Sequence, residues 1–172
     1  MTPAPFERSG HGECCAGITL IELVIIVAIV STLAGICIPA YNRYQENTRI
    51  AKAVLDIRAI EHDLLITESL GGKFPDDISG VPVAERRDPW GGYYQYFNPA
   101  TKKGGGHGGI QRFDKLAKPL NTDFDLYSMG RDGQSKANLD SKVSLDDIVR
   151  ALNGQYVGLG SQLSLIHISE PT

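Results

Sequence analysis

The sequence predicts an α+β fold, in which a long N-terminal helix packs on a small antiparallel β-sheet followed by a C-terminal loop. Three observations predict it. Residues 18–38 form an almost unbroken apolar run. Residues 40–70 then repeat apolar side chains at three- and four-residue steps, which is typical of a helix with one buried face. Aromatic and alternating stretches of strand character follow Gly71-Gly72.

The chain begins with a polar segment, residues 1–17, that is predicted to be cut away rather than folded. An ordinary secretory signal would have a shorter apolar core followed by its cleavage site, whereas here the predicted cut precedes the apolar run. Arg8 is the only Lys or Arg in this segment, so charge gives little information on membrane orientation.

The apolar run of residues 18–38 is predicted to be a membrane-spanning helix. At about 1.5 Å per residue it would be about 30 Å long, which matches the hydrocarbon core of a bilayer and is too long for a strand. Glu22 is its one charged residue. Because a carboxylate there costs about 2.5–3.5 kcal/mol on insertion scales, Glu22 indicates a functional partner. The alternative is that Glu22 lies at the headgroup level of an ordinary anchor.

The helix predicted over residues 40–70 is amphipathic. Its apolar face consists of Ile50, Ala53, Val54, Ile57, Ile60 and Leu64. We expect this face to cover the core of one small domain, residues 39–162, and the helix to end at Gly71-Gly72. A core face accounts for the whole stripe, so no cofactor site is inferred from it.

A turn at Asp88-Pro89-Trp90-Gly91 is predicted to lead into a strand that contains the aromatic run 93–96. Aromatic clusters can stack on bases or sugars, but an apolar helix face needs to be covered, and this favours core packing. His107 lies in a glycine-rich loop without companion ligands, so we expect it to be solvated rather than bound to a metal.

Charge and cysteine usage exclude several classes of protein. Acidic and basic residues balance over 40–162, so composition gives no case for a nucleic-acid partner. Cys14 and Cys15 precede the apolar run and Cys37 lies within it, which excludes a disulfide framework in the domain. The domain also lacks G-x-S-x-G, H-E-x-x-H and P-loop motifs, so an anchored enzyme is disfavoured.

Gly17, Ile18, Thr19-Leu20-Ile21-Glu22 and Pro39 together resemble the class III signal of type IV prepilins and pseudopilins. The resemblance implies a pilin-like domain, cleavage after Gly17 by a prepilin peptidase and N-methylation of Ile18 by the same enzyme. It also implies that Glu22 faces the free amino terminus of a neighbouring subunit in a homopolymer, and that the anchor ends at Pro39. Ile18 stands where the family usually has Phe.

Two further motifs resemble the major pseudopilins of type II secretion: the Asp88-Pro89-Trp90-Gly91 segment and Tyr127-Ser128-Met129-Gly130-Arg131-Asp132-Gly133. In that family a calcium ion holds the C-terminal loop, and the missing disulfide fits such a member. The resemblance implies Asp132, Asp146 and Asp147 as calcium ligands, and carboxylates are chemically suited to calcium. The alternative has Asp132 as a turn residue and a helix that begins at Ser144, with Ser144 and Asp147 as its capping box.

The resemblance implies a structural subunit of a type II secretion pseudopilus. The chain would be anchored once in the bacterial inner membrane, with its domain in the periplasm, and would contact an assembly platform and minor pseudopilins. The alternative is a type IV pilin for adhesion, twitching or DNA uptake. Residues 163–172 match the translation of a sequencing-library adapter, so we expect them to be foreign to the native chain.

Overall fold

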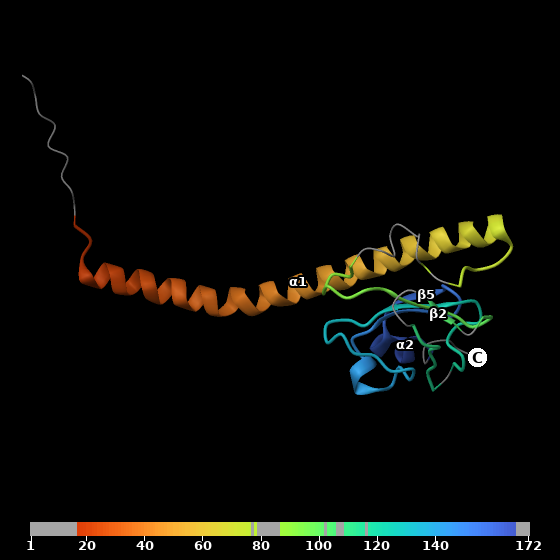
Figure 1. Ribbon diagram of the computed structural model, residues 1–172. Helices are drawn as coiled ribbons and strands as arrows, with labels where there is room; N and C mark the ends of the chain where they lie inside the picture. The colour runs from red at the N-terminus through yellow and green to blue at the C-terminus, as the bar shows by residue number, and fades with distance from the viewer. Residues whose placement is uncertain are drawn as a thin grey trace, which may run out of the picture. The chain divides into compact units, whose positions relative to one another are not determined.

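The computed structural model describes residues 17–76, 78, 87–101, 103–105, 109–115 and 117–167. Figure 1 shows the elements, whose bounds are α1 Leu20–Gly71, β1 Gln95–Asn98, β2 Lys103–Gly105, β3 Asp125–Ser128, the 3-10 turn η1 Lys142–Ser144, β4 Ile148–Ala151, β5 Tyr156–Leu159 and α2 Gly160–His167. The chain divides into two compact units, Met1–Asn42 and Arg43–Thr172, and each is described by itself.

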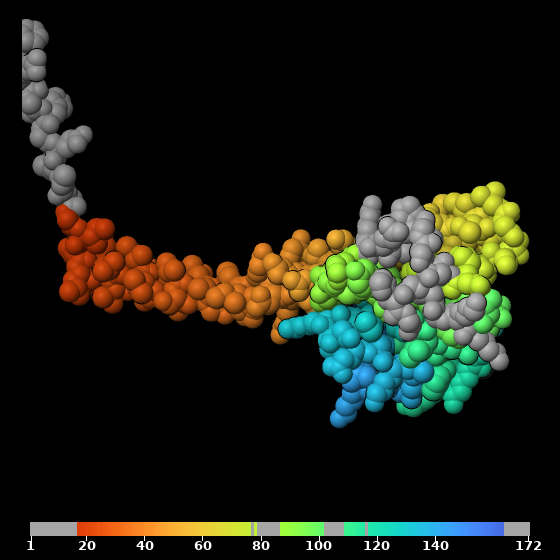
Figure 2. Space-filling model, in the orientation of Figure 1, coloured from red at the N-terminus to blue at the C-terminus, as the bar shows by residue number. Residues whose placement is uncertain are grey.

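The first unit contains the apolar part of α1. All side chains of residues 20–42 are exposed (Figure 2). Within the described residues, α1 is the one helix long and apolar enough to cross a membrane by length and composition, and its most apolar window has a mean hydropathy of 2.7. The helix continues through Pro39. The predicted apolar helix is therefore confirmed as a helix that could span a bilayer.

The second unit begins with the amphipathic part of α1. Ala53, Ile57, Ile60 and Leu64 are fully buried, and Ile50 and Val54 pack against them. These six residues are the face predicted from the sequence. The helix ends at Gly71 because Gly72 has a φ of 71°, a left-handed conformation that favours glycine, and its N–H donates to the Glu68 carbonyl at 2.6 Å. Both the buried face and the end of the helix are thus confirmed.

The sheet is antiparallel throughout, with strand order β2-β1-β3-β4-β5. The central strand β3 pairs with β1 through Leu126 opposite Tyr96 and with β4 through Tyr127 opposite Val149. A long helix on an antiparallel sheet confirms the predicted α+β fold.

Each face of the sheet carries its own apolar cluster. The helix-side cluster consists of Ala53, Ile57, Ile60, Leu64, Ile78, Tyr94, Tyr96, Phe124, Leu126 and Ile148. The loop-side cluster consists of Leu120, Tyr127, Leu139, Val149, Ala151 and Leu163. Figure 1 shows the C-terminal part of α1 on one side of the sheet and α2 on the other. Both faces of the sheet are therefore covered, and the sheet forms a middle layer.

Strand β3 differs from its predicted pattern for this reason. In the sequence, Phe124, Leu126 and Ser128 alternate with more polar positions, a pattern typical of a strand with one buried face, yet Asp125 and Tyr127 are buried as well. Tyr127 packs with Leu120 and Leu139, which come from irregular segments that carry no periodic signal. Covering both faces of a strand removes the polar side of the pattern.

The helix α2 includes Leu163, the first residue of the segment expected to be foreign. Leu163 is fully buried in the loop-side cluster. The origin of residues 163–172 stays a prediction.

Candidate functional site

The N-terminal motif lies at the start of α1. Gly17 and Ile18 precede the helix, and the Ile18 side chain is 70% exposed. The Thr19 hydroxyl accepts a hydrogen bond from the Glu22 N–H at 3.3 Å, and the Thr19 carbonyl accepts one from Leu23 N–H at 3.1 Å. Thr19 is thus the N-cap of the helix, a role suited to a hydroxyl. The cap fixes Glu22 in the first turn, close in sequence to the residue expected to carry the amino terminus.

The Asp88-Pro89-Trp90-Gly91 motif forms a tight turn that Asp88 holds together. One carboxylate oxygen of Asp88 accepts from the N–H groups of Trp90 at 3.1 Å and Gly92 at 2.7 Å. The Asp88 N–H donates to the Gly92 carbonyl at 2.9 Å. Gly91 has a φ of 95°, which an L side chain rarely adopts. The backbone of this turn therefore explains Asp88 and Gly91 of the motif.

The two pseudopilin-like motifs meet at a single hydrogen bond. The other carboxylate oxygen of Asp88 accepts from the Ser128 hydroxyl at 2.6 Å, and both residues are buried. Ser128 Oγ also accepts from the Gly130 N–H at 3.2 Å. Motifs that lie 40 residues apart in sequence thus form one polar connection between the turn and the end of β3.

Trp90 packs against the helix-side cluster and donates from its indole N–H to Glu46 of α1 at 3.1 Å. Tyr94 is fully buried, and its hydroxyl donates to Asp56 of α1 at 2.8 Å. Burial, with Asp56 beside it, raises the pKa of Tyr94. These contacts confirm that the aromatic run packs in the core.

The predicted calcium ligands divide into two groups. Asp146 Oδ2 accepts from the N–H groups of Arg131 at 2.9 Å and Asp132 at 3.1 Å, so Asp132 and Asp146 lie at one point of the loop. Asp132 is exposed, and its Oδ1 accepts from Gln134 N–H at 2.8 Å. Asp147 is instead fully buried and forms an ion pair with Arg112. The structure thus places the Asp146 carboxylate against the main chain of Asp132, with Asp147 committed elsewhere.

The helix that the alternative interpretation begins at Ser144 is not formed, so that interpretation was wrong about this segment. Lys142–Ser144 is a single 3-10 turn, and strand β4 begins at Ile148. Ser144 is buried, and its hydroxyl bonds to the main chain of Lys136 within the loop instead of capping a helix. Within the described ranges no three Asp, Glu, His or Cys side chains gather as a metal site, and His107 lies outside those ranges.

Two buried arginines were not predicted as structural residues. Arg150 is 2% exposed and pairs with Glu61 of α1 at 2.8 Å and with Asp123 at 2.5 Å, and its Cζ lies 4.0 Å from the centre of the Phe124 ring. One signal was available, because Glu61 lies four residues from Ile57 and three from Leu64, on the apolar face. No comparable signal marks Arg112.

Arg112 contacts the C-terminal loop, residues 129–147. Its guanidinium bonds to Asp147 and to the Ser135 hydroxyl, and its Cζ lies 4.2 Å from the centre of the Tyr127 ring. Burial raises the pKa of Asp147, while the Arg112 charge and the Ser135 hydroxyl oppose the rise. Among the described residues, Arg112 Nε and Asp147 Oδ1 are buried without a hydrogen-bond partner.

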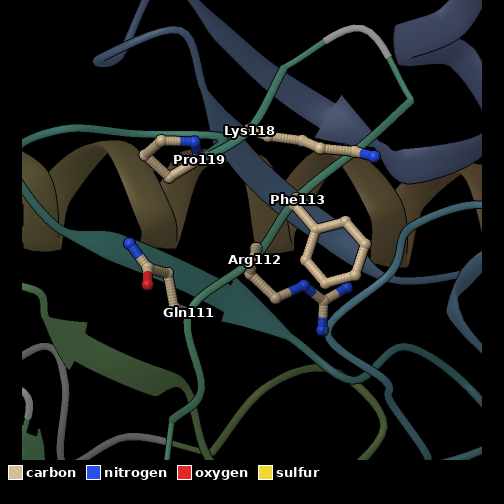
Figure 3. Close-up of a pocket in the computed structure, with 5 residues that line it drawn as sticks. All are labelled: Gln111, Arg112, Phe113, Lys118 and Pro119. Carbon is tan, nitrogen blue, oxygen red and sulfur yellow. The ribbon is translucent and has the colours of Figure 1, made fainter.

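A hollow of about 470 Å³ opens beside Arg112 (Figure 3). It is lined by Gln111, Arg112, Phe113, Lys118 and Pro119. Lys118 and Phe113 extend toward the same side in Figure 3, and Lys118 Nζ lies 5.9 Å from the centre of the Phe113 ring. No predicted site residue lines this hollow.

Comparison with known proteins gives two groups of relatives. The chain is 26% identical over 140 residues to a type II secretion system core protein G from Pseudomonas aeruginosa, with 69% of this chain and 85% of the relative covered. It is 27% identical over 145 residues to a protein of the same name from Klebsiella pneumoniae, covering 72% and 90%. A fimbrial protein from Neisseria meningitidis is 33% identical over 79 residues, 46% of each chain.

The chain belongs to the superfamily of pseudopilins and type IV pilins. Within this superfamily, the core protein G relatives align along most of their length, whereas the fimbrial protein aligns over less than half. No family model matches the chain, and no solved structure matches it.

Proposed function

We propose that this chain is the major subunit of a type II secretion pseudopilus, a filament that polymerises to push folded proteins across the outer membrane. The observation that carries the proposal is the Asp88–Ser128 connection, which joins the two motifs that resemble major pseudopilins. The length over which the core protein G relatives align supports it. The alternative, a type IV pilin, is supported by the shorter fimbrial match.

The proposal assigns a chemical role to the N-terminal motif. A prepilin peptidase/methyltransferase would cleave after Gly17 and methylate the amino group of Ile18, both of which are exposed. Glu22 would then pair with the amino terminus of a neighbouring subunit. Because a carboxylate in hydrocarbon is costly when it is unpaired, this pair favours docking and fixes register. The domain would lie in the periplasm, with an inner-membrane platform and minor pseudopilins as assembly partners.

Processing tests the first step. Full-length chain co-expressed with a prepilin peptidase should yield, by mass spectrometry, a mature protein that begins at a methylated Ile18. Gly17→Ala should block the cut, because the added side chain clashes where the peptidase must admit the chain. A wild-type chain that still begins at Met1, or is cut elsewhere, contradicts the proposal.

Assembly tests the second step. Glu22→Ala should remain processed and membrane-bound but give few filaments, since an apolar anchor inserts at least as well without the charge. Glu68→Ala, on the same helix but near its other end, is the matched control and should assemble normally. Normal filament yield from Glu22→Ala would make Glu22 an interfacial residue. Secretion restored in a strain without its own major pseudopilin, rather than twitching, separates pseudopilus from pilus.

We also propose that the C-terminal loop binds calcium through Asp132 and Asp146. Calcium takes six to eight oxygen ligands, so two carboxylates would need main-chain carbonyls and water to complete the set. The contact between Asp146 and the main chain of Asp132 supports their convergence. Asp147 does not fit this donor set, because it is buried and paired with Arg112.

Calcium should then raise the melting temperature of the full chain by several degrees relative to chelator, since an ion that binds only the folded state adds stability by mass action. Asp132→Ala and Asp146→Ala should each abolish the difference. Asp140→Ala is the control, because Asp140 already pairs with Lys115 at 3.3 Å. Identical melting curves in calcium and chelator leave Asp132 as a turn residue.

A further inference from the structure

We propose that Arg112 is a metal-independent clip that closes the C-terminal loop, defined here as residues 129–147. Its guanidinium bonds to Ser135 in the middle of the loop and to Asp147 at its end. Ser135 Oγ also donates to Asp147 Oδ2 at 2.6 Å, so the three side chains form one connected group. One cation from outside the loop therefore joins two points within it.

The main chain and a neighbouring ring hold Arg112 in position. Its N–H donates to Asp125 Oδ2 at 2.8 Å, which ties it to the central strand β3. Its carbonyl accepts from Leu120 N–H at 2.9 Å. The Tyr127 ring lies 4.2 Å from its Cζ, a distance at which a cation and an aromatic face attract each other. The main chain of Arg112 is thus fixed to the sheet, and its side chain extends from there to the loop.

Because Arg112 and Asp147 are both buried, each charge needs the other as its partner. Arg112 is 1% exposed, and Asp147 is fully buried. Losing either partner would leave the other charge uncompensated inside the protein, which is strongly unfavourable. Arg112 Nε and Asp147 Oδ1, two of the buried atoms without a hydrogen-bond partner among the described residues, belong to this same pair of side chains. Asp147 therefore belongs to the guanidinium and not to an ion in the loop.

A second closure lies next to the clip and needs no ion either. Asp146, the neighbour of Asp147, accepts from the N–H groups of Arg131 and Asp132 near the start of the loop. The loop is consequently held at its start by Asp146 and at its middle by Asp147 through Ser135 and Arg112. We infer that it keeps its structure in chelator, and that calcium at Asp132 and Asp146 would add to a loop that is already closed. This inference does not depend on the filament function.

Hydrogen exchange of the full-length chain in detergent micelles tests the clip. In chelator, the wild-type loop should be protected. Arg112→Met keeps a long side chain but removes the charge and the donors, and should raise exchange over 129–147 by roughly tenfold or more. Lys118→Met, an exposed cation of the neighbouring segment, is the matched control and should leave the loop unchanged. Protection of α1 residues 53–64 reports on the rest of the domain.

Three results would overturn the proposal: a wild-type loop that is unprotected in chelator and ordered only by calcium, an Arg112→Met loop as protected as the wild type, or full recovery of Arg112→Met by calcium. If Arg112→Met unfolds the whole domain, Ser135→Ala decides. It removes one hydroxyl, so exchange should rise around 134–137 while α1 stays protected. Unchanged exchange in Ser135→Ala would then make Arg112 a general core residue and not a clip.

Discussion

The two faces of the sheet are stabilised by different means. The helix-side cluster combines four residues of α1 with residues of the strands and of the segments beside them, and its buried cation, Arg150, pairs with both Glu61 and Asp123. The loop-side cluster has fewer residues and none from α1, and two of them, Leu120 and Leu139, come from irregular segments. Its buried cation, Arg112, bonds to Ser135 and Asp147, while Arg112 Nε and one Asp147 oxygen have no hydrogen-bond partner among the described residues. The helix side is thus packed mainly by α1, whereas the loop side also depends on the hydrogen-bonded group of Arg112, Ser135 and Asp147.

This difference shows what a periodic element contributes. A helix brings apolar side chains to one face every three or four residues, so a single element covers the sheet. Loops have no such period, and they must satisfy their own backbone polar groups as well. On the loop side, Asp146 accepts from the N–H groups of Arg131 and Asp132, and the Ser144 hydroxyl bonds to the main chain of Lys136.

The largest effect should come from Arg150→Met on the helix side. The change removes the buried cation that Glu61, which is 7% exposed, shares with Asp123 and leaves Glu61 with only the half-exposed Arg58, so it should lower the free energy of unfolding by about 3–5 kcal/mol. Denaturation of the full chain in detergent, followed by the fluorescence of Trp90, measures it. Arg58→Met is the control: Arg58 also contacts Glu61, but its side chain is 43% exposed, so the loss should be about 1 kcal/mol or less. Equal losses would contradict the comparison.

The next effect concerns apolar packing on the two faces. Ile60→Ala, at the centre of the predicted helix face, should cost about 2–5 kcal/mol through lost contacts and the cavity left behind. Leu139→Ala on the loop side should cost less, because irregular segments can collapse more readily around the space. The same denaturation experiment compares them. A larger loss for Leu139→Ala would show that the loop side is packed as rigidly as the helix side.

Asp125 should make the loop side sensitive to pH. Burial raises its pKa to about 6 from an ordinary 3.8, although the N–H of Arg112 and the amide of Asn121 favour the charged form. The folded state thus binds a proton that the unfolded chain releases between these values. Stability should increase as pH falls from above 6 toward 4, by at most about 3 kcal/mol.

Unfolding free energies at pH 7.5 and 4.5 test the role of Asp125. Asp125→Asn should remove most of the increase on acidification, whereas Asp63→Asn, an acid on the surface side of α1, should leave it in place. A difference between wild type and Asp125→Asn that is the same at both pH values would exclude titration of Asp125.

The smallest effects should come from alanine substitutions of two glycines at the start of the C-terminal loop. They should distinguish backbone strain from a steric clash of the added Cβ. Gly130 has a φ of 62°, and a Cβ there would lie 2.3 Å from the Asp146 carbonyl oxygen. Gly133 has a φ of 65°, but a Cβ would meet nothing within 4 Å. Gly133→Ala should cost about 1 kcal/mol from backbone strain, and Gly130→Ala about 1–2 kcal/mol more. Melting temperatures measure both, and equal shifts would remove the close approach as a cause.

The helix side could be predicted from the sequence because its signals are local. The six residues from Ile50 to Leu64 repeat with the helical period, and Gly72 ends the helix through its own backbone conformation. The N-terminal motif is equally local, since Thr19 caps the turn that contains Glu22. The turn at Asp88 is defined by residues within five positions of one another.

The buried ion pairs on both sides of the sheet could not be predicted because their partners are distant in sequence. Arg112 and Asp147 lie 35 residues apart, and Arg150 and Glu61 lie 89 residues apart. Nothing in the sequence around either arginine distinguishes it from a solvated one, and the single signal, for Arg150 alone, is the position of Glu61 on the apolar face of the helix. Asp147 is an example. The family resemblance implied that it shares a calcium site with its neighbour Asp146, whereas its side chain is buried and paired with the Arg112 guanidinium.

The sequence by itself determined the apolar helix with its acid, the amphipathic face, the glycine stop and the turn motifs, because each depends on residues within one or two turns of chain. Only the tertiary structure decided which charges are buried, which acids of the C-terminal loop converge and that both faces of the sheet are covered. The physical reason is that burial of a charge is stable only when an opposite charge from another segment arrives beside it.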